Sequence, residues 1–312
     1  MRRLRCPTCS NEVFFDSLQC VRCLTELAVT FDDGGRLSVV DLASVRPCAN
    51  RSTWACNWTV ASSVDGARWC QSCVIVDAGG WVDDARVAAF QAAQRRALFQ
   101  LTALGIPWGP ESGLKLTFRS SSAGDAAVIG HRGGEITLDL DEAEPAQQEE
   151  TRARLGELYR TPLGHLRHEL GHFVWQQVVA PDPARLAEFR AAFGDETVDY
   201  AAALEDHYAR VDDGGWRDEF VSFYASAHPW EDFAESWAHL MHVHDVVETG
   251  AEWGVGPLPV DPHDADTWLS AAVDVTIATN ELARAMGMRD LYPFTLSPPV
   301  RAKIGFCWSL IR

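Results

Sequence analysis

The chain has 312 residues, and its 27 Lys and Arg against 44 Asp and Glu give a formal net charge of −17 at pH 7. With 47% hydrophobic and 23% charged residues, the composition is that of a globular protein, and the length allows one large core plus a small additional domain. An acidic surface repels polyanions, which argues against nucleic acid or an anionic membrane as the main partner.

The sequence also indicates the cellular compartment in which the protein is expected. No apolar segment approaches the ~18 residues that a membrane helix needs, and the first residues lead into cysteines without the apolar stretch of a signal peptide. Eight of the nine cysteines fall within the first 73 residues, in pairs typical of metal ligands rather than of disulfides. We therefore expect a cytoplasmic protein that makes no contact with membranes.

Two Cys-x-x-Cys pairs near the N-terminus are separated by ten residues. Four sulfurs at this spacing can close a tetrahedron around one ion, so they predict a structural zinc site of the zinc-ribbon type. The four cysteines are Cys6, Cys9, Cys20 and Cys23.

A second group of four cysteines keeps one Cys-x-x-Cys pair and spreads the other pair by seven residues; it consists of Cys48, Cys56, Cys70 and Cys73. We predict a second structural zinc here, with a redox dithiol or bound iron as the alternatives. Closed four-cysteine sites have no open coordination position, so residues 1–80 are expected to fold around metal and to do no chemistry. The remaining Cys307 is interpreted as a buried packing residue.

Helical periodicity begins after residue 80, and we place the domain boundary between residues 80 and 81. A long helix is expected at 82–104. Alternating apolar and polar residues at 114–118 and 135–140 predict two antiparallel strands. Nearly all of the chain from residue 144 onward has a helical pattern. The predicted fold class is α+β, a mostly helical domain with a small antiparallel sheet that follows a small zinc-ribbon β domain.

A helix is predicted at 161–179, because Thr161 is a good N-cap and a proline follows at the first helical position. It contains a His-Glu-x-x-His motif at residues 168–172. Positions four apart stack on one helical face, so His168 and His172 can reach one ion from the same side. Glu169 can address a water on that ion, which is the pattern of a hydrolytic zinc site.

The third ligand must come from elsewhere, and the candidate is Glu231, just after Pro229. Glu235 lies one turn further on and can accept the outer N–H of a ligand histidine. The alternative is that both glutamates decorate an exposed helix. The competing third ligands are His228, Asp232, His239, His242 and His244, and His165 is expected to support the site or face solvent.

Residues 224–242 resemble the second active-site helix of gluzincins of the anthrax lethal factor type, in which a tyrosine stands seven residues before the ligand glutamate. The whole chain is similar to bacterial zinc-binding metallopeptidases with an N-terminal zinc ribbon. These share the spaced cysteines, His-Glu-x-Gly-His, Phe-Gly-Asp-Glu (193–196), Asp-Tyr-Ala (199–201) and His-Pro-Trp-Glu-Asp-Phe-Ala-Glu (228–235).

This resemblance implies a zincin-like fold with His168, His172 and Glu231 as zinc ligands. It also implies Glu169 as general base and Tyr224 near the developing oxyanion. The sequence departs from the lethal-factor pattern in length, because 58 residues separate the second histidine from the ligand glutamate.

The sequence thus predicts a zinc metallopeptidase with one catalytic and two structural zinc ions. Its substrate would be a protein or peptide, aligned along an edge strand at 135–140, and the ribbons could bind a protein partner. The alternative is a zinc-stabilised interaction or sensor module without proteolytic activity, which would have no need of Glu169. A nucleic-acid-binding ribbon is a third option, but acidic residues nearly cancel the basic edge of the first ribbon.

Overall fold

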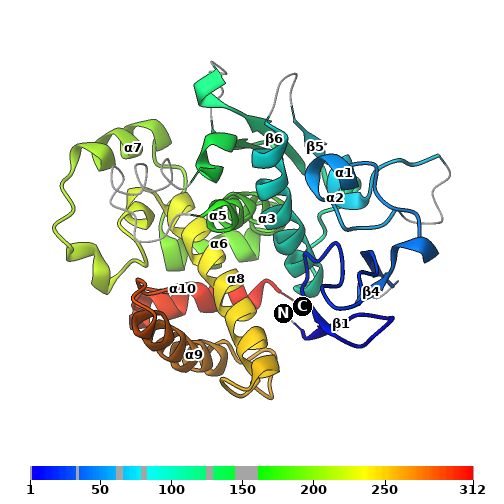
Figure 1. Cartoon of the computed structure of the whole chain (residues 1–312). Helices are drawn as coiled ribbons and strands as arrows, with labels where there is room; N and C mark the ends of the chain where they lie inside the picture. The colour runs from blue at the N-terminus through cyan, green and yellow to red at the C-terminus, as the bar shows by residue number, and fades with distance from the viewer. Residues whose placement is uncertain are drawn as a thin grey trace. The chain divides into compact units, whose positions relative to one another are not determined.

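The computed structural model describes residues 2–32, 35–60, 66–78, 83–123, 129–144 and 161–311. The chain divides into two compact units, Met1–Glu144 and Pro145–Arg312 (Figure 1). The first contains all described strands and the second is helical, so the predicted α+β class is confirmed. The boundary expected between residues 80 and 81 lies outside the described residues and stays a prediction.

The first unit begins with short strands and turns. Strand β1 (Leu4–Arg5) pairs antiparallel with β2 (Glu12–Val13), and β3 (Leu27–Phe31) with β4 (Leu37–Asp41). The short helices η1 (Leu42–Ser44), α1 (Arg51–Trp54) and α2 (Gln71–Val74) follow. A small buried cluster of Cys6, Val13, Cys20 and Leu27 is the core of the first hairpin region. So small a core is marginal without further support, as expected for a metal-stabilised ribbon.

Helix α3 (Asp84–Ala103) is the long helix of this unit and corresponds to the helix expected at 82–104, of which residue 82 is not described. The Asp83 side chain caps it by accepting hydrogen bonds from the first backbone N–H groups. Phe90, Leu98 and Leu101 are fully buried on its inner face. The helix also buries four polar residues, Gln91, Gln94, Arg95 and Gln100.

A four-stranded sheet has the order β5-β6-β8-β7, with β5 (Val76–Asp77), β6 (Lys115–Arg119), β7 (Gly130–Arg132) and β8 (Glu135–Asp139). The short helices η2 (Pro110–Ser112), η3 (Ser121–Ala123) and η4 (Leu140–Ala143) flank these strands.

Two strand predictions are wrong in detail. Strands β6 and β8 pair in parallel, with Leu116 opposite Ile136. The reason is that the short strand β7 comes between them in the sequence and runs antiparallel to β8, so the chain has reversed direction twice when β8 begins. Gly133 and Gly134, both at positive φ, turn β7 back into β8. Strand β8 is also not the edge strand expected at 135–140, since β6 and β7 flank it on both sides.

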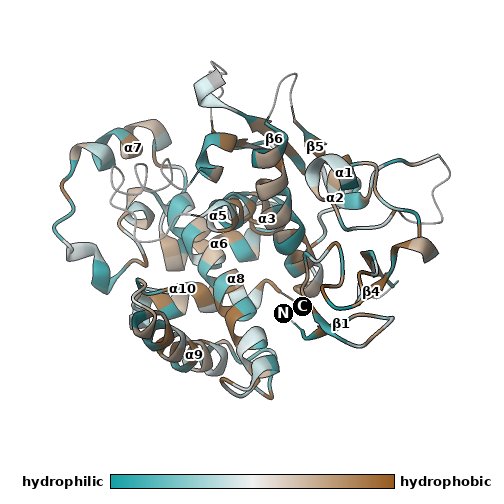
Figure 2. Cartoon of the chain, viewed as in Figure 1, coloured by the Kyte–Doolittle hydropathy of each residue, from teal (hydrophilic) through white to brown (hydrophobic). Residues whose placement is uncertain are grey.

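The second unit consists of helices. They are α5 (Pro162–Val174), the π-helix η5 (Trp175–Val179), α6 (Pro183–Phe193), α7 (Tyr200–Ala209), η6 (Gly215–Asp218), η7 (Tyr224–Ala227), α8 (Pro229–Trp253), α9 (Ala265–Ala285) and α10 (Pro298–Ser309). Helix α8 packs against α5, α9 and α10, and Figure 1 shows it running through this unit. Hydrophobic and hydrophilic residues alternate along α8 and α9 in Figure 2, as expected of helices with one buried face.

Within the described ranges, every helix is too short or too polar to span a membrane.

Candidate metal centres

Helix α5 holds the His-Glu-x-x-His motif, and its start confirms the prediction from sequence. The Thr161 hydroxyl accepts a hydrogen bond from Gly164 N at 3.0 Å, and Pro162 is the first helical residue. The α-helix runs to Val174 and then changes to a π-helical turn. His168, Glu169 and His172 are all buried on this helix.

Helix α8 supplies the second half of the centre. It begins at Pro229, where His228 Nδ1 accepts from Trp230 N at 3.1 Å and caps the helix. Glu231 therefore lies in the first turn and Glu235 one turn later, on the same face. Glu231 is 1% exposed, which excludes the alternative that it decorates an exposed helix.

The crossing of α5 and α8 depends on Gly171, inside the motif. A Cβ atom at this position would lie 2.8 Å from Ala234 Cα and 3.2 Å from Trp237 Cβ. Only a glycine lets the two helices approach this closely, and the approach brings the carboxylate of Glu231 to the imidazoles.

Three donor groups meet at this crossing. Glu231 Oε2 lies 3.0 Å from His168 Nε2 and 3.4 Å from His172 Nε2. One donor atom from each residue lies within 4.8 Å of the others. Zinc bonds of about 2.0 to 2.1 Å in a tetrahedron require donors about 3.3 Å apart, so this group fits zinc and leaves a fourth position for water or substrate.

Glu235 orients the first of these histidines. Its Oε1 lies 2.7 Å from His168 Nδ1, and its Oε2 accepts a hydrogen bond from the Ser222 hydroxyl at 2.6 Å. An ionised carboxylate only accepts, so Nδ1 carries the proton and Nε2 is left with its lone pair toward the metal position. The sequence indicated Glu235 for this contact but gave no sign of Ser222.

Glu169 has one oxygen engaged and one open. Its Oε1 lies 3.2 Å from His165 Nε2, whereas Oε2 is buried and has no hydrogen-bond partner among the described residues. A buried carboxylate oxygen without a partner is costly in a folded protein. It adjoins the two histidines of this group, so it is the candidate for accepting a proton from a water at this site.

Two tyrosines line the centre. The ring of Tyr224 lies 5.8 Å from the ring of His168, centroid to centroid. Tyr200, the first residue of α7, donates a hydrogen bond from its hydroxyl to Glu231 Oε1 at 2.6 Å. Sequence reasoning did not single out Tyr200, although it stands in the Asp-Tyr-Ala segment that the resemblance had marked.

The charges and hydrogen bonds around this group act on the pKa values of its two glutamates. Burial opposes the charged form of Glu231, but His172 and His168 hold its pKa well below the ordinary range. For Glu235, burial is outweighed by the hydrogen bond from His168, and its pKa falls to about 2. Two buried carboxylates are thus kept ionised, as a cation site requires.

The competing third ligands have other roles. His228 caps α8, and Asp232 forms an ion pair with Lys303 at 2.6 Å. His239 contacts the Tyr292 hydroxyl at 2.6 Å, His242 contacts Arg167 at 2.7 Å, and His244 stacks on Trp268.

The first four-cysteine group is assembled as predicted. Cys6 Sγ lies 3.6 Å from Cys23 Sγ, and Cys9 Sγ lies 3.7 Å from Cys20 Sγ. Zinc–sulfur bonds of about 2.3 Å give a tetrahedron with edges of about 3.8 Å, whereas a disulfide needs about 2.05 Å. These separations fit a shared metal ion.

The second four-cysteine group is also assembled and is fully buried. Cys56 Sγ lies 3.6 Å from Cys70 Sγ and 3.7 Å from Cys73 Sγ. Helix α3 contacts this group through Gln91, whose Oε1 lies 3.6 Å from Cys73 Sγ. Hydrogen bonding with Cys48 raises the pKa of Cys56, but hydrogen bonds with Cys70 and Cys73, together with the positive charge of the buried Arg95, lower it overall.

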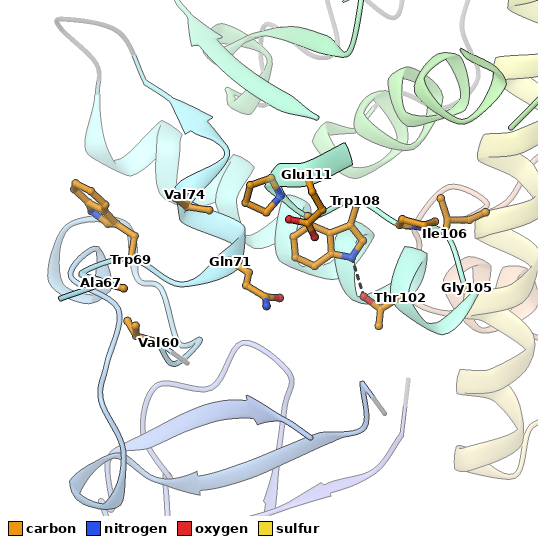
Figure 3. Close-up of a pocket in the computed structure, with 13 residues that line it drawn as sticks. Val60, Ala67, Trp69, Gln71, Val74, Thr102, Gly105, Ile106, Trp108 and Glu111 are labelled. Carbon is orange, nitrogen blue, oxygen red and sulfur yellow. Dashed lines mark hydrogen bonds between the residues drawn. The ribbon is translucent and has the colours of Figure 1, made fainter. Parts of the chain in front are cut away.

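A separate cavity of about 560 Å³ lies in the first unit, between the loop after α3 and the segment around α2 (Figure 3). Its walls are mostly apolar, with Trp69, Val74 and Trp108 among them, and Trp108 Nε1 donates to Thr102 at 2.8 Å. Glu111 is the single ionisable side chain among the lining residues that the structure describes. The cavity therefore lacks a group of metal ligands.

Comparison with known proteins agrees with this geometry. A zinc-ribbon domain family matches residues 3–78, and the family described as "Putative zinc-binding metallo-peptidase" matches residues 84–310. Rv2568c of Mycobacterium tuberculosis and Mb2598c of Mycobacterium bovis, each named an uncharacterized protein, are 34% identical over 327 residues, spanning 100% of this chain and 95% of each relative. No solved structure gives a significant match. The chain belongs to this family of zinc-binding metallo-peptidases with an N-terminal zinc ribbon.

Proposed function

We propose that the chain is a zinc peptidase of the gluzincin type, which hydrolyses peptide bonds in proteins or peptides. The observation that carries the proposal is the meeting of His168, His172 and Glu231 beside the open carboxylate oxygen of Glu169. Three buried donors fit a zinc ion, and a carboxylate with one oxygen that has no partner among the described residues fits hydrolysis rather than structure.

The two imidazoles and Glu231 Oε2 would hold the zinc ion. When bound, zinc supplies Lewis acidity, which lowers the pKa of a water toward ~7 and polarises a peptide carbonyl. Glu169 removes a proton from the attacking water as the water adds to the carbonyl carbon. The same carboxyl then delivers that proton to the leaving amine, so the base is restored within one cycle.

The remaining residues prepare this reaction. Glu235 keeps the Nδ1 proton of His168 in place, so the ligand nitrogen stays unprotonated. Tyr224 is the proposed donor to the developing oxyanion, on the strength of its position beside His168. Burial raises the pKa of Tyr224 well above its ordinary value, so its hydroxyl stays protonated and able to donate.

The two four-cysteine groups are proposed as structural zinc sites, giving three zinc ions per chain. Their eight thiols require a reducing compartment, which supports the cytoplasm as the proposed location. The ribbons are the proposed surface for a protein partner.

Glu169→Gln tests the proposal, with the exposed Glu188→Gln on α6 as the matched control. We expect wild type and Glu188→Gln to cleave a peptide library until a chelator is added. Glu169→Gln should keep its zinc and lose turnover. Cleavage by Glu169→Gln at the parent rate would refute the assignment of the base. A wild type that binds zinc but cleaves nothing would favour the alternative of an interaction or sensor module.

A further inference from the structure

The two carboxylate oxygens of Glu231 have separate tasks. Oε2 faces both imidazoles, at 3.0 Å from His168 and 3.4 Å from His172. Oε1 accepts the hydrogen bond from the Tyr200 hydroxyl at 2.6 Å. The metal position thus lies on the side of one oxygen, and Tyr200 occupies the other.

Tyr200 is held for this contact by its own surroundings. It opens α7, where Asp199 caps the helix by accepting from Ala202 N at 3.0 Å. Its ring makes edge contacts with His228 at 5.2 Å and Trp230 at 5.9 Å, centroid to centroid. Both of these rings stand at the start of α8, immediately before Glu231. The starts of α7 and α8 are therefore packed together, and the hydroxyl direction is fixed by this packing.

A carboxylate can bind a metal through one oxygen or through both. Binding through both would take up the position that a hydrolytic zinc site must leave for water. A hydrogen bond to one oxygen lowers the tendency of that oxygen to bind the metal, because its lone pair is already engaged. Carboxylate ligands of metals are commonly oriented in this way by residues that hydrogen-bond to the ligands without touching the metal.

We propose that Tyr200 is a positioning residue, which engages Glu231 Oε1 so that Glu231 offers the metal Oε2 alone and the water position stays open. The proposal rests on the proposed function only in taking His168, His172 and Glu231 as the metal ligands. It gives Tyr200 a task different from the one proposed for Tyr224, which is to donate to the developing oxyanion.

The test compares Tyr200→Phe with two control variants. Phenylalanine keeps the ring contacts and removes only the hydroxyl, and Tyr200 is 38% exposed, so the variant should fold. Tyr208→Phe makes the same change on the same helix at a 59% exposed ring. Tyr224→Phe removes the other hydroxyl of the centre.

Two readouts are independent of peptidase activity. One is the dissociation constant of zinc at this centre, measured by chelator competition in protein whose four-cysteine sites stay loaded. The other is the visible spectrum of cobalt placed in the same centre, which reports coordination number. For Tyr200→Phe we expect a dissociation constant raised about 10- to 100-fold and a cobalt spectrum shifted toward higher coordination number. Tyr208→Phe should leave both unchanged, and Tyr224→Phe, which removes a hydroxyl near that of Tyr200, should change them less than Tyr200→Phe does.

An unchanged dissociation constant and spectrum in Tyr200→Phe would overturn the proposal. Equal changes in Tyr208→Phe would overturn it as well, because they would show a general effect of α7. If the metal readouts change as expected but no peptide is cleaved by the wild type, the role of Tyr200 stands and the proposed function fails.

Discussion

The substitution Gly171→Ala tests whether the close crossing of α5 and α8 builds the metal centre. The new methyl group would lie 2.8 Å from Ala234 Cα and 3.1 Å from Ala234 O. Carbon atoms normally pack at about 3.5 Å or more, so the helices must separate by roughly 0.7 Å. Neither neighbouring atom can move aside alone, because both belong to the backbone of α8.

The separation acts directly on the ligands. His172 adjoins the substituted residue and Glu231 lies less than one turn from Ala234, so most of the shift reaches the donor atoms. A site that must hold its geometry to about 0.5 Å does not tolerate it. Overpacking costs about 1 to 3 kcal/mol, and the better helix propensity of alanine returns up to about 1 kcal/mol. We expect a net loss of up to about 2 kcal/mol in the free energy of unfolding, with weaker zinc binding.

Urea unfolding of protein whose four-cysteine sites stay loaded gives the stability, and chelator competition gives the zinc affinity. Gly305→Ala is the matched control, because Gly305 is also helical, in α10, and its added Cβ would meet no atom within 4 Å. It should be neutral or stabilising by up to about 1 kcal/mol. If Gly171→Ala were as stable as Gly305→Ala and bound zinc as tightly as the wild type, the reasoning from the crossing would be refuted.

Three further predictions concern the surroundings of the centres. Glu235→Gln should weaken zinc binding at the centre between α5 and α8 about 10- to 100-fold by chelator competition, because His168 loses its carboxylate acceptor; unchanged affinity would contradict that role. Burial lowers the pKa of His239 to about 4, below the ordinary value of ~6.5, so protonation favours the unfolded chain. The free energy of unfolding that depends on a neutral His239 is fully present above pH 6.5 and is lost as the pH falls toward 4. Between pH 8 and pH 5 this loss amounts to about 2 kcal/mol. His239→Gln should remove that part of the acid sensitivity in urea unfolding, and an identical pH profile would exclude it. Arg95→Met should speed chelator extraction of the zinc held by the second four-cysteine group, because zinc with four thiolates carries a net charge of −2 and the substitution removes a buried positive charge that helps to lower the pKa of Cys56; extraction at the wild-type rate would argue against this.

Much of the centre was predictable because its signals are local. The cap at Thr161, the motif at 168–172 and the proline before Glu231 fix two helices and the faces that carry the donors. The cysteine spacings likewise bring the sulfurs of each group together.

Other features depend on contacts that no short segment encodes. Tyr200 reaches Glu231 only because α7 starts beside the start of α8, and Ser222 reaches Glu235 from the turn before η7. The direction of β6 relative to β8 depends on a three-residue strand, β7, which is too short to give a clear alternating pattern. These are consequences of tertiary packing, and spacing rules cannot supply them.

The most direct test of the central claim is the number of zinc ions bound per chain in the wild type and in Glu231→Ala. The wild type should bind three, and Glu231→Ala should bind two after dialysis against a mild chelator, because the carboxylate from α8 completes the centre that the two histidines of α5 begin. Three ions retained by the variant, or only two in the wild type, would contradict the claim that these two helices together hold a metal.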